Sequence, residues 1–228
     1  MESGILDQIV FKPNIEFLAK RLRIKPEGRY FPELKKVVAE ARAIAKPKAA
    51  FRVGYEEEKN HISVLINQIR FTSRVLRVNL EPVHRVFFYL CTCGEELESW
   101  SKGMNDLLYQ YWTDAIKESA LRSATRALNE YLKEQFQLPK TSAMAPGSLP
   151  DWPITEQRGL FDLMDGLDRQ IGVRLTDSLL MLPIKSISGV RFPTENRFES
   201  CQLCARENCP GRRAPYDQEL YERRFANG

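Results

Sequence analysis

The chain lacks a long apolar run, a basic block and a secretion signal. No uninterrupted hydrophobic stretch approaches the ~18 residues that span a membrane. Basic residues occur as isolated pairs such as Arg212-Arg213, and the net charge is only +4 over 228 residues, so no surface for nucleic acid or membrane is indicated. Met1 to Pro13 has no basic region followed by an apolar stretch. We therefore expect a cytoplasmic protein without a nucleic-acid or membrane partner.

Histidine is equally scarce. The two histidines, His61 and His84, lie far apart and neither has a partner at metal-ligand spacing. The sequence also contains no G-x-S-x-G, Walker or dinucleotide-binding pattern. These absences remove the commonest signatures of hydrolases, P-loop proteins and dehydrogenases, and they leave open whether the chain is an enzyme.

Cysteine is the residue type that does form a pattern. In a reducing cytoplasm the five cysteines indicate metal binding, catalysis or packing rather than disulfides. Cys201 and Cys204 are spaced so that one turn directs both sulfur atoms to one metal ion, and Cys209 follows after a short loop. A fourth ligand would come from Cys93, from Cys91 or from outside the chain.

The spacing C-x2-C-x4-C differs from the C-x3-C-x2-C of radical AdoMet enzymes. It also differs from the ferredoxin pattern, although Cys209-Pro210 matches the last pair of that pattern. The cysteines therefore predict an Fe–S cluster or a zinc site. The alternative interpretation is a surface loop with reduced thiols.

Apolar residues recur at helical spacing in some stretches and as short continuous runs in others. Val86 to Leu90 is apolar without alternation, which predicts a strand covered on both faces. Since the elements do not alternate regularly, the pattern predicts an α+β fold. Helices are expected over residues 14–22, 32–45, 114–136 and 155–167 and from residue 95 onward, and strands over 48–53, 62–66, 83–93, 173–182 and 188–192.

A loop with three prolines comes after the longest expected helix. Pro146-Gly147 and Asp151-Trp152-Pro153 fix a rigid, non-helical path, because proline locks φ and restricts the residue before it. Such a turn can present backbone groups to a ligand, or it can be an ordered loop and no more. Asp151, Glu156 and Asp177 are candidate acids or bases, with helix capping as the alternative. Trp152 is a core anchor or a platform for a planar ligand.

Several separate motifs resemble one known family. Gly172-x-x-Leu175-Thr-Asp-Ser and Pro183-x-x-Ser-x-Ser-Gly189 match in order and spacing, and Thr92-Cys93-Gly94-x-x-Leu97-Glu98 matches a strand-to-helix turn. The family is the activation (reactivation) domain of cobalamin-dependent methionine synthase, including its short stand-alone relatives. The similarity covers about residues 80–195, and the N-terminal helix more weakly.

The resemblance implies a twisted antiparallel sheet flanked by helices. It also implies docking onto a cobalamin-carrying partner, whose cob(II)alamin is reduced and remethylated by S-adenosylmethionine. Pro146, Gly147, Asp151 and Trp152 occupy the family's AdoMet-loop positions.

Other family positions have changed, which puts AdoMet binding in the family's manner in question. The loop arginine and tyrosine of the family fall at Ala143 and Ser148, and a helix glutamate falls at Arg126. A tyrosine pair falls at Arg197 and Phe198.

The sequence thus leads to one main hypothesis and two alternatives. The main one is an accessory or activation protein for a corrinoid-dependent methyltransferase, with a domain at 1–195, N-terminal helices (1–47) packed on it and a cysteine-containing tail at 196–228. An Fe–S cluster on Cys201, Cys204 and Cys209, with Cys93 as a possible fourth ligand, would deliver an electron to cobalt. The alternatives are a non-catalytic module with structural zinc that docks a corrinoid protein, and AdoMet binding through a rearranged loop.

Overall fold

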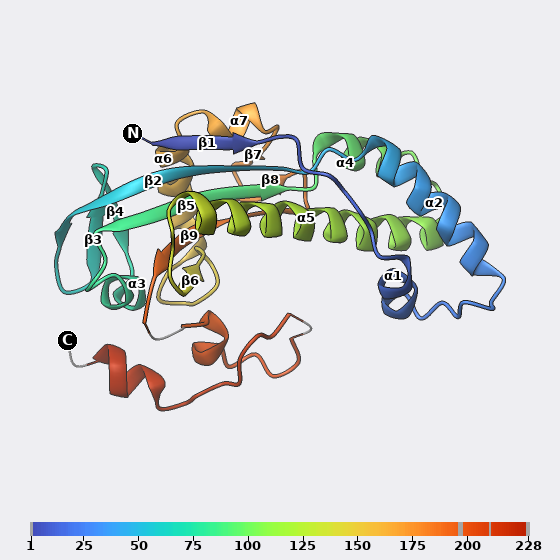
Figure 1. The fold of residues 1–228 in the computed structure, drawn as a ribbon. Helices are drawn as coiled ribbons and strands as arrows, with labels where there is room; N and C mark the ends of the chain where they lie inside the picture. Colours follow the sequence, from blue (N-terminus) through green and yellow to red (C-terminus); the bar gives the residue numbers. More distant parts are fainter. Residues whose placement is uncertain (1, 196–197, 210, 227–228) are drawn as a thin grey trace.

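The computed structural model describes residues 2–195, 198–209 and 211–226, and it confirms the α+β prediction. An open antiparallel sheet forms the centre of the molecule (Figure 1). Its strands run in the order β4-β3-β2-β5-β9-β6, and β1 pairs with the first half of β2. The strands are β1 Ser3–Leu6, β2 Lys48–Lys59, β3 Ser63–Ile66, β4 Ile69–Thr72, β5 Arg85–Thr92, β6 Thr141–Met144 and β9 Ser186–Pro193.

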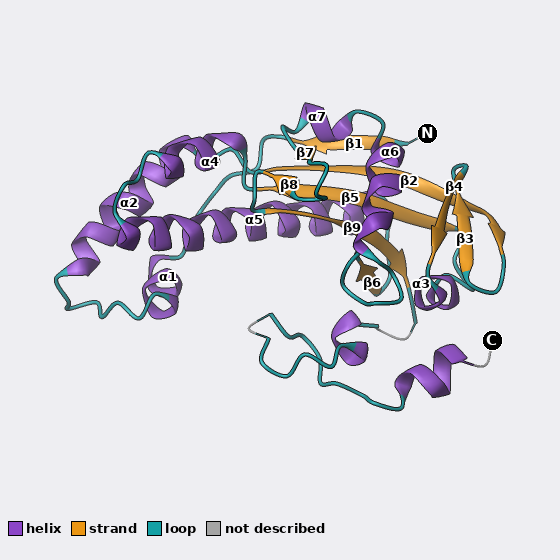
Figure 2. Ribbon diagram, turned by 180° about the vertical axis from the view of Figure 1, so that it is seen from behind, coloured by secondary structure: helices purple, strands orange, loops and turns teal. Residues whose placement is uncertain are grey.

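Helices cover both faces of the sheet (Figure 2). Four of them share one hydrophobic core with one face: α1 Ile15–Arg21, α2 Tyr30–Ile44, α4 Glu95–Lys102 and α5 Leu107–Gln135. Three others pack on the opposite face: α3 Arg74–Asn79, α6 Gln157–Met164 and α7 Leu167–Gln170. In the described part of the chain, no helix combines the length and the apolar character needed to cross a membrane.

Strand β5 connects the two cores, as the apolar run from Val86 predicts. Successive side chains of a strand point to opposite faces. Phe87 and Tyr89 therefore enter the core under α5, while Phe88 and Leu90 enter the core under α6. A strand whose odd-numbered and even-numbered side chains are both apolar has both faces covered, so it lies in the middle of three layers.

The longest helix begins earlier than expected. The apolar stripe predicts a start at Asp114, but α5 begins at Leu107, where the Asp106 side chain accepts from the backbone N–H of Leu108 (2.7 Å). Its first turns carry exposed Leu107 and Tyr111, so the stripe that marks the buried part of the helix is absent there. The capping aspartate, rather than the hydrophobic period, sets this end.

Two expectations for residues 155–182 are wrong. The helix expected over 155–167 ends at Met164, because Asp165 (φ 52°) and Gly166 (φ 85°) adopt left-handed conformations before α7 begins; Thr155 lies inside a short 3-10 helix and caps nothing. The strand expected over 173–182 is a hairpin of β7 (Arg174–Leu175) and β8 (Met181–Leu182). The chain reverses between them, where Thr176 N–H donates to the carbonyl of Leu180 (2.9 Å).

The sequence pattern does not predict several short elements. β1, β4, β6 and α3 have four to six residues each, too few to show a period. The same holds for the two short helical turns of the C-terminal part, at Ser200–Leu203 and Glu222–Ala226. Phe198 and Phe225 of that part are fully buried in the core under α6, so a boundary at residue 195 remains a proposal.

Candidate functional site

The proline-glycine loop follows β6 and closes on itself. Gly147 N–H donates to the carbonyl of Trp152 (2.7 Å), and Trp152 N–H donates to the carbonyl of Leu149 (3.1 Å). Gly147 has φ +78°, and a Cβ there would lie 2.9 Å from the side chain of Ile154, so only glycine fits. These two backbone N–H groups therefore already have acceptors within the turn.

The Asp151 carboxylate binds the N-terminus of a neighbouring helix. It accepts from the Ser73 side chain, from Arg74 N–H (3.2 Å) and from Val75 N–H (3.0 Å). These groups form the N-terminus of α3, whose unpaired amides attract a carboxylate. Of the two roles considered for Asp151, capping is the one the structure shows.

Trp152 and Pro146 face the core. Trp152 is fully buried and meets the ring of Phe71 edge to face, with the centroids 6.1 Å apart. Its indole nitrogen has no hydrogen-bond partner among the described residues. Glu156, another candidate acid, accepts from the backbone N–H of Thr72 (2.9 Å). The loop thus serves to anchor β6 on α3 and β4.

Cys91 and Cys93 lie at the end of β5, in the core under α5. Burial raises the pKa of each thiol to about 12, because the charged form loses its hydration. The Cys93 sulfur lies 3.6 Å from the carbonyl oxygen of Gly94. Both therefore have the environment of packing residues, and a thiolate ligand at Cys93 would need that environment to change.

The other three cysteines lie in a C-terminal stretch, residues 199–214 without residue 210, which we call the cysteine segment. Its organising residue is Arg212, whose guanidinium donates to the carbonyl oxygens of Cys201 (3.0 Å), Cys204 (3.1 Å), Arg206 and Ala214 (3.2 Å). The Cys201 sulfur accepts from the backbone N–H of Arg213 (3.4 Å). The sequence pattern does not predict this role of Arg212, because Arg212-Arg213 stands in it only as an isolated basic pair.

These contacts do not assemble a metal site. Among the described residues, no three or more histidines, cysteines, aspartates and glutamates converge as metal ligands would. Cys201, Cys204 and Cys209 are each partly exposed free thiols, and Pro210 of the Cys209-Pro210 pair lies outside the described residues. The arrangement as it stands does not fit a cluster or a tetrahedral zinc ion.

The cysteine segment is attached to the sheet through β6. Phe198 N–H donates to the Ser142 side chain (2.7 Å), and Glu199 forms a parallel bridge with Ala143. The segment thereby covers the outer edge of β6 (Figure 1). Ala143, the position of the family's loop arginine, is consequently paired on both sides. Of the two positions of the family's tyrosine pair, Phe198 is buried, and Arg197 lies outside the described residues.

A cleft of about 740 Å³ separates the cysteine segment from α5. Four arginines are among the residues that line it, together with an apolar patch of Leu121 and Ile187. The complete lining is Glu118, Leu121, Arg122, Thr125, Arg126, Asn129, Glu130, Ile187, Gly211, Arg212 and Arg213. Arg126, the position of the family's helix glutamate, lines this cleft and also the hollow between residues 5–12 and α5.

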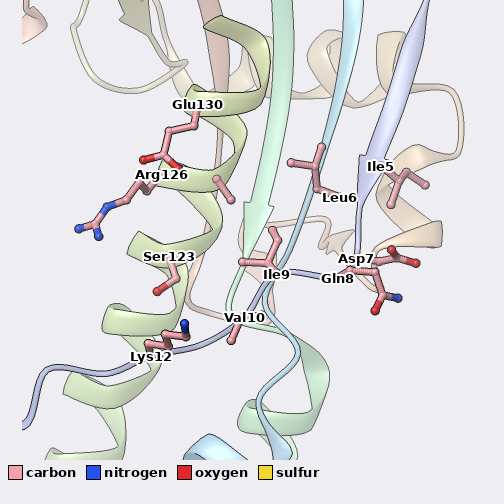
Figure 3. A pocket seen from close by; sticks show the side chains of 11 residues that line it. Ile5, Leu6, Asp7, Gln8, Ile9, Val10, Lys12, Ser123, Arg126 and Glu130 are labelled. Atoms are coloured by element: carbon pink, nitrogen blue, oxygen red, sulfur yellow. The ribbon is translucent and has the colours of Figure 1, made fainter. Parts of the chain in front are cut away.

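Two further hollows lie beside these elements. One of about 510 Å³ is enclosed by the proline-glycine loop, α3 and the C-terminal part, with Leu149, Asp151, Leu203 and Tyr216 in its wall. Another of about 560 Å³ lies between residues 5–12 and α5 (Figure 3). Neither gathers several titratable side chains with displaced pKa values, which would mark a catalytic centre.

Two exposed apolar side chains flank β8, Leu180 before it and Ile184 after it, and we call them the exposed tip. Leu180, between β7 and β8, and Ile184, just before β9, each have 64% of their surface exposed. Both lie in the stretch Gly172–Gly189, whose motifs carry the family resemblance. Exposed large apolar side chains at the two ends of one short strand offer apolar surface for a protein contact.

One known protein family matches part of this chain. Residues 110–209 match the family described as vitamin B12-dependent methionine synthase, activation domain. That range contains the proline-glycine loop, the hairpin, β9 and all three cysteines of the cysteine segment. No curated protein matches the chain.

Among solved structures, the crystal structure of the MetH reactivation domain bound to AdoHcy is similar to this chain. The TM-score is 0.57 at 14% identity, and the match covers 88% of this chain and 81% of the other. At this identity the likeness shows a shared fold. The resemblance indicated by the sequence motifs is confirmed by the family match and by the fold together.

Proposed function

We propose, from the match to the vitamin B12-dependent methionine synthase activation domain, that this chain is an accessory protein that supports reductive reactivation of a corrinoid-dependent methyltransferase. The observation that carries the proposal is the match over residues 110–209, within a chain whose fold follows the reactivation domain over 88% of its length. The partner would be a cobalamin-binding protein such as methionine synthase. A cytoplasmic location stays a prediction.

The exposed tip at Leu180 and Ile184 is the docking surface that best fits this role. Its side chains offer apolar area that a partner can remove from water, at about 25 cal/mol per Å² buried. Lys185 next to Ile184 forms an ion pair with Asp114 of α5 (3.0 Å), and its carbonyl oxygen accepts from Cys93 N–H (3.0 Å), so the backbone beside Ile184 is tied to the main body. A surface fixed in this way loses little conformational freedom on binding.

Reactivation of a cobalamin-dependent methionine synthase that lacks its own activation domain tests the proposal. With a chemical reductant and AdoMet present, the chain should bind the truncated enzyme and accelerate loss of the cob(II)alamin absorbance. Leu180→Asp combined with Ile184→Asp should abolish binding. Ile62→Asp, at a position with 53% exposure beside β3, is the matched control. Absence of both binding and acceleration with the unaltered chain would contradict the proposal.

The metal predictions are separate parts of this proposal and rest on cysteine spacing. Purification without oxygen, followed by iron, sulfide and zinc analysis, distinguishes them. Iron with sulfide supports the redox version, and zinc without a redox transition supports the module that only docks. A metal-free protein, with unchanged reactivation by the Cys201→Ser variant, would exclude both.

The third part of the proposal is AdoMet binding by this chain through a rearranged loop. The solved relative was crystallised with AdoHcy. In this chain the positions of the family's ligand-holding side chains are Ala143, Ser148 and Arg126, so the residues present do not fit the ligand in the family's manner. Calorimetry with AdoMet decides the matter, and an absence of heat at millimolar ligand would exclude a rearranged site.

A further inference from the structure

The cleft between α5 and the cysteine segment has a charge pattern that the proposed function does not use. Four arginines line it against two glutamates, Glu118 and Glu130. Positive charge in a confined cleft attracts anions more strongly than the same charge on a flat surface, because its low-dielectric walls focus the field.

The two arginines on the cysteine segment differ in the groups that their guanidiniums contact. Arg213 forms an ion pair with Glu199 (Nε to Oε2, 3.2 Å). Arg212 instead donates to four backbone carbonyl oxygens, which fix the guanidinium without cancelling its charge. The segment thus holds a cation rigidly at the cleft wall.

The opposite wall, on α5, adds more positive charge. Glu118 is shared by two guanidinium groups, those of Arg21 and Arg122, so the group of three carries a net positive charge. Arg126, two turns further along, is exposed and forms no ion pair in the described part of the chain. Arg126 lies between two hollows, because it lines both this cleft and the hollow beside residues 5–12. In Figure 3 its guanidinium points away from Leu6 and Ile9.

We propose that this cleft binds a small organic anion that carries phosphate groups. A guanidinium group recognises phosphate with paired hydrogen bonds, and Arg126 can offer them from the α5 wall. Arg212 contributes its charge from the opposite wall, because its terminal N–H groups already donate to backbone carbonyls. Leu121 and Ile187 provide an apolar patch for the uncharged part of the ligand. The volume of about 740 Å³ lies within the usual range for small-molecule sites.

Titration calorimetry at low ionic strength with ATP, inorganic pyrophosphate, citrate and adenosine tests this proposal on the full chain. ATP and pyrophosphate should bind, adenosine should not, and citrate should bind more weakly than pyrophosphate. Arg126→Glu should weaken ATP binding about tenfold or more, since it removes one charged hydrogen-bond donor and adds a negative charge. Because Arg126 is exposed, the variant should fold, and circular dichroism checks that it does.

Arg42→Glu on α2 is the control, because it makes the same change of net charge at an exposed position away from the cleft. It should leave ATP binding within about twofold of the unaltered chain, as expected when a screened charge lies far from the ligand. An equal loss in both variants would show that only overall charge matters and would overturn the site. No heat with ATP and pyrophosphate, or citrate binding as tight as pyrophosphate, would overturn the phosphate assignment.

Discussion

The Arg212 guanidinium donates to the carbonyl oxygen of Cys204, 3.1 Å away and eight residues earlier in the chain. With its bonds to three other carbonyl groups, this arginine holds the cysteine segment closed. The backbone of the cysteine segment is thus held together by one side chain, which bonds Cys201 and Cys204 directly.

Replacing Arg212 should open the segment. Arg212→Gln removes a charged donor, and each hydrogen bond from a charged group contributes about 1.5–3 kcal/mol. We expect Cys201, Cys204 and Cys209 to react with a thiol reagent roughly tenfold faster in this variant, through easier local opening. Arg206→Gln, which leaves the backbone carbonyl of residue 206 in place, is the control. Equal labelling rates in the two variants would show that Arg212 does not restrain the segment.

The five cysteines should fall into two classes in the folded protein. Cys91 and Cys93 are fully buried, and burial raises the pKa of each to about 12, so the reactive thiolate is scarce. The cysteines at 201, 204 and 209 are partly exposed. Labelling at pH 8 should therefore show three fast thiols, with the remaining two appearing only on unfolding. Fast labelling of all five would contradict the placement of β5 in the core.

Asp151 should contribute to stability rather than to chemistry. Asp151→Ala removes the side-chain acceptor of the Arg74 and Val75 N–H groups, while the Ser73 side chain still accepts from Leu76 N–H. Loss of such a capping interaction costs about 0.5–2 kcal/mol. Urea unfolding should show that loss. Asp162→Ala, at an exposed aspartate of α6, should change the free energy of unfolding by less than about 0.5 kcal/mol. A stable Asp151→Ala protein with a specific functional defect would favour a ligand role instead.

Glu118 gives an acid-dependent contribution to stability. Its hydrogen bond with the Arg21 guanidinium, more than any other contact, lowers the pKa of the carboxyl from 4.5 to about 2. A depressed pKa stabilises the fold above the unfolded-state value, and this contribution is lost as pH falls from about 4.5 to 2. Glu118→Gln should flatten that part of the stability curve. Identical acid profiles for the variant and the parent would contradict the ion pair.

Gly189 permits the close packing of β9 against its neighbours. A Cβ at this position would lie 2.6 Å from the Met144 carbonyl oxygen and 2.7 Å from the Tyr89 hydroxyl. Gly189→Ala should therefore destabilise the fold by about 1–3 kcal/mol, as overpacking does. Thermal unfolding measures this loss of stability. Gly103→Ala is the control, because the nearest atom to an added Cβ there is the Trp100 carbonyl oxygen, 3.4 Å away.

The sequence by itself determined the parts whose reason is local. The apolar run from Val86 to Leu90 placed β5 between two layers, because only a central strand has buried side chains on both faces. The helical period of α5 and the proline-restricted path of the 146–153 loop followed from short-range sterics. The motifs from Gly172 to Gly189 carried the family resemblance, which the comparisons confirm.

Tertiary structure decided what each polar side chain does. Asp151 meets the start of α3 across 78 residues of sequence, at Ser73, and no local pattern announces such a partner. The α5 cleft likewise exists only because Phe198 and Glu199 attach the cysteine segment to β6. Local periodicity fixes elements, while contacts between distant segments fix which charges share a cleft and which sulfur atoms lie apart.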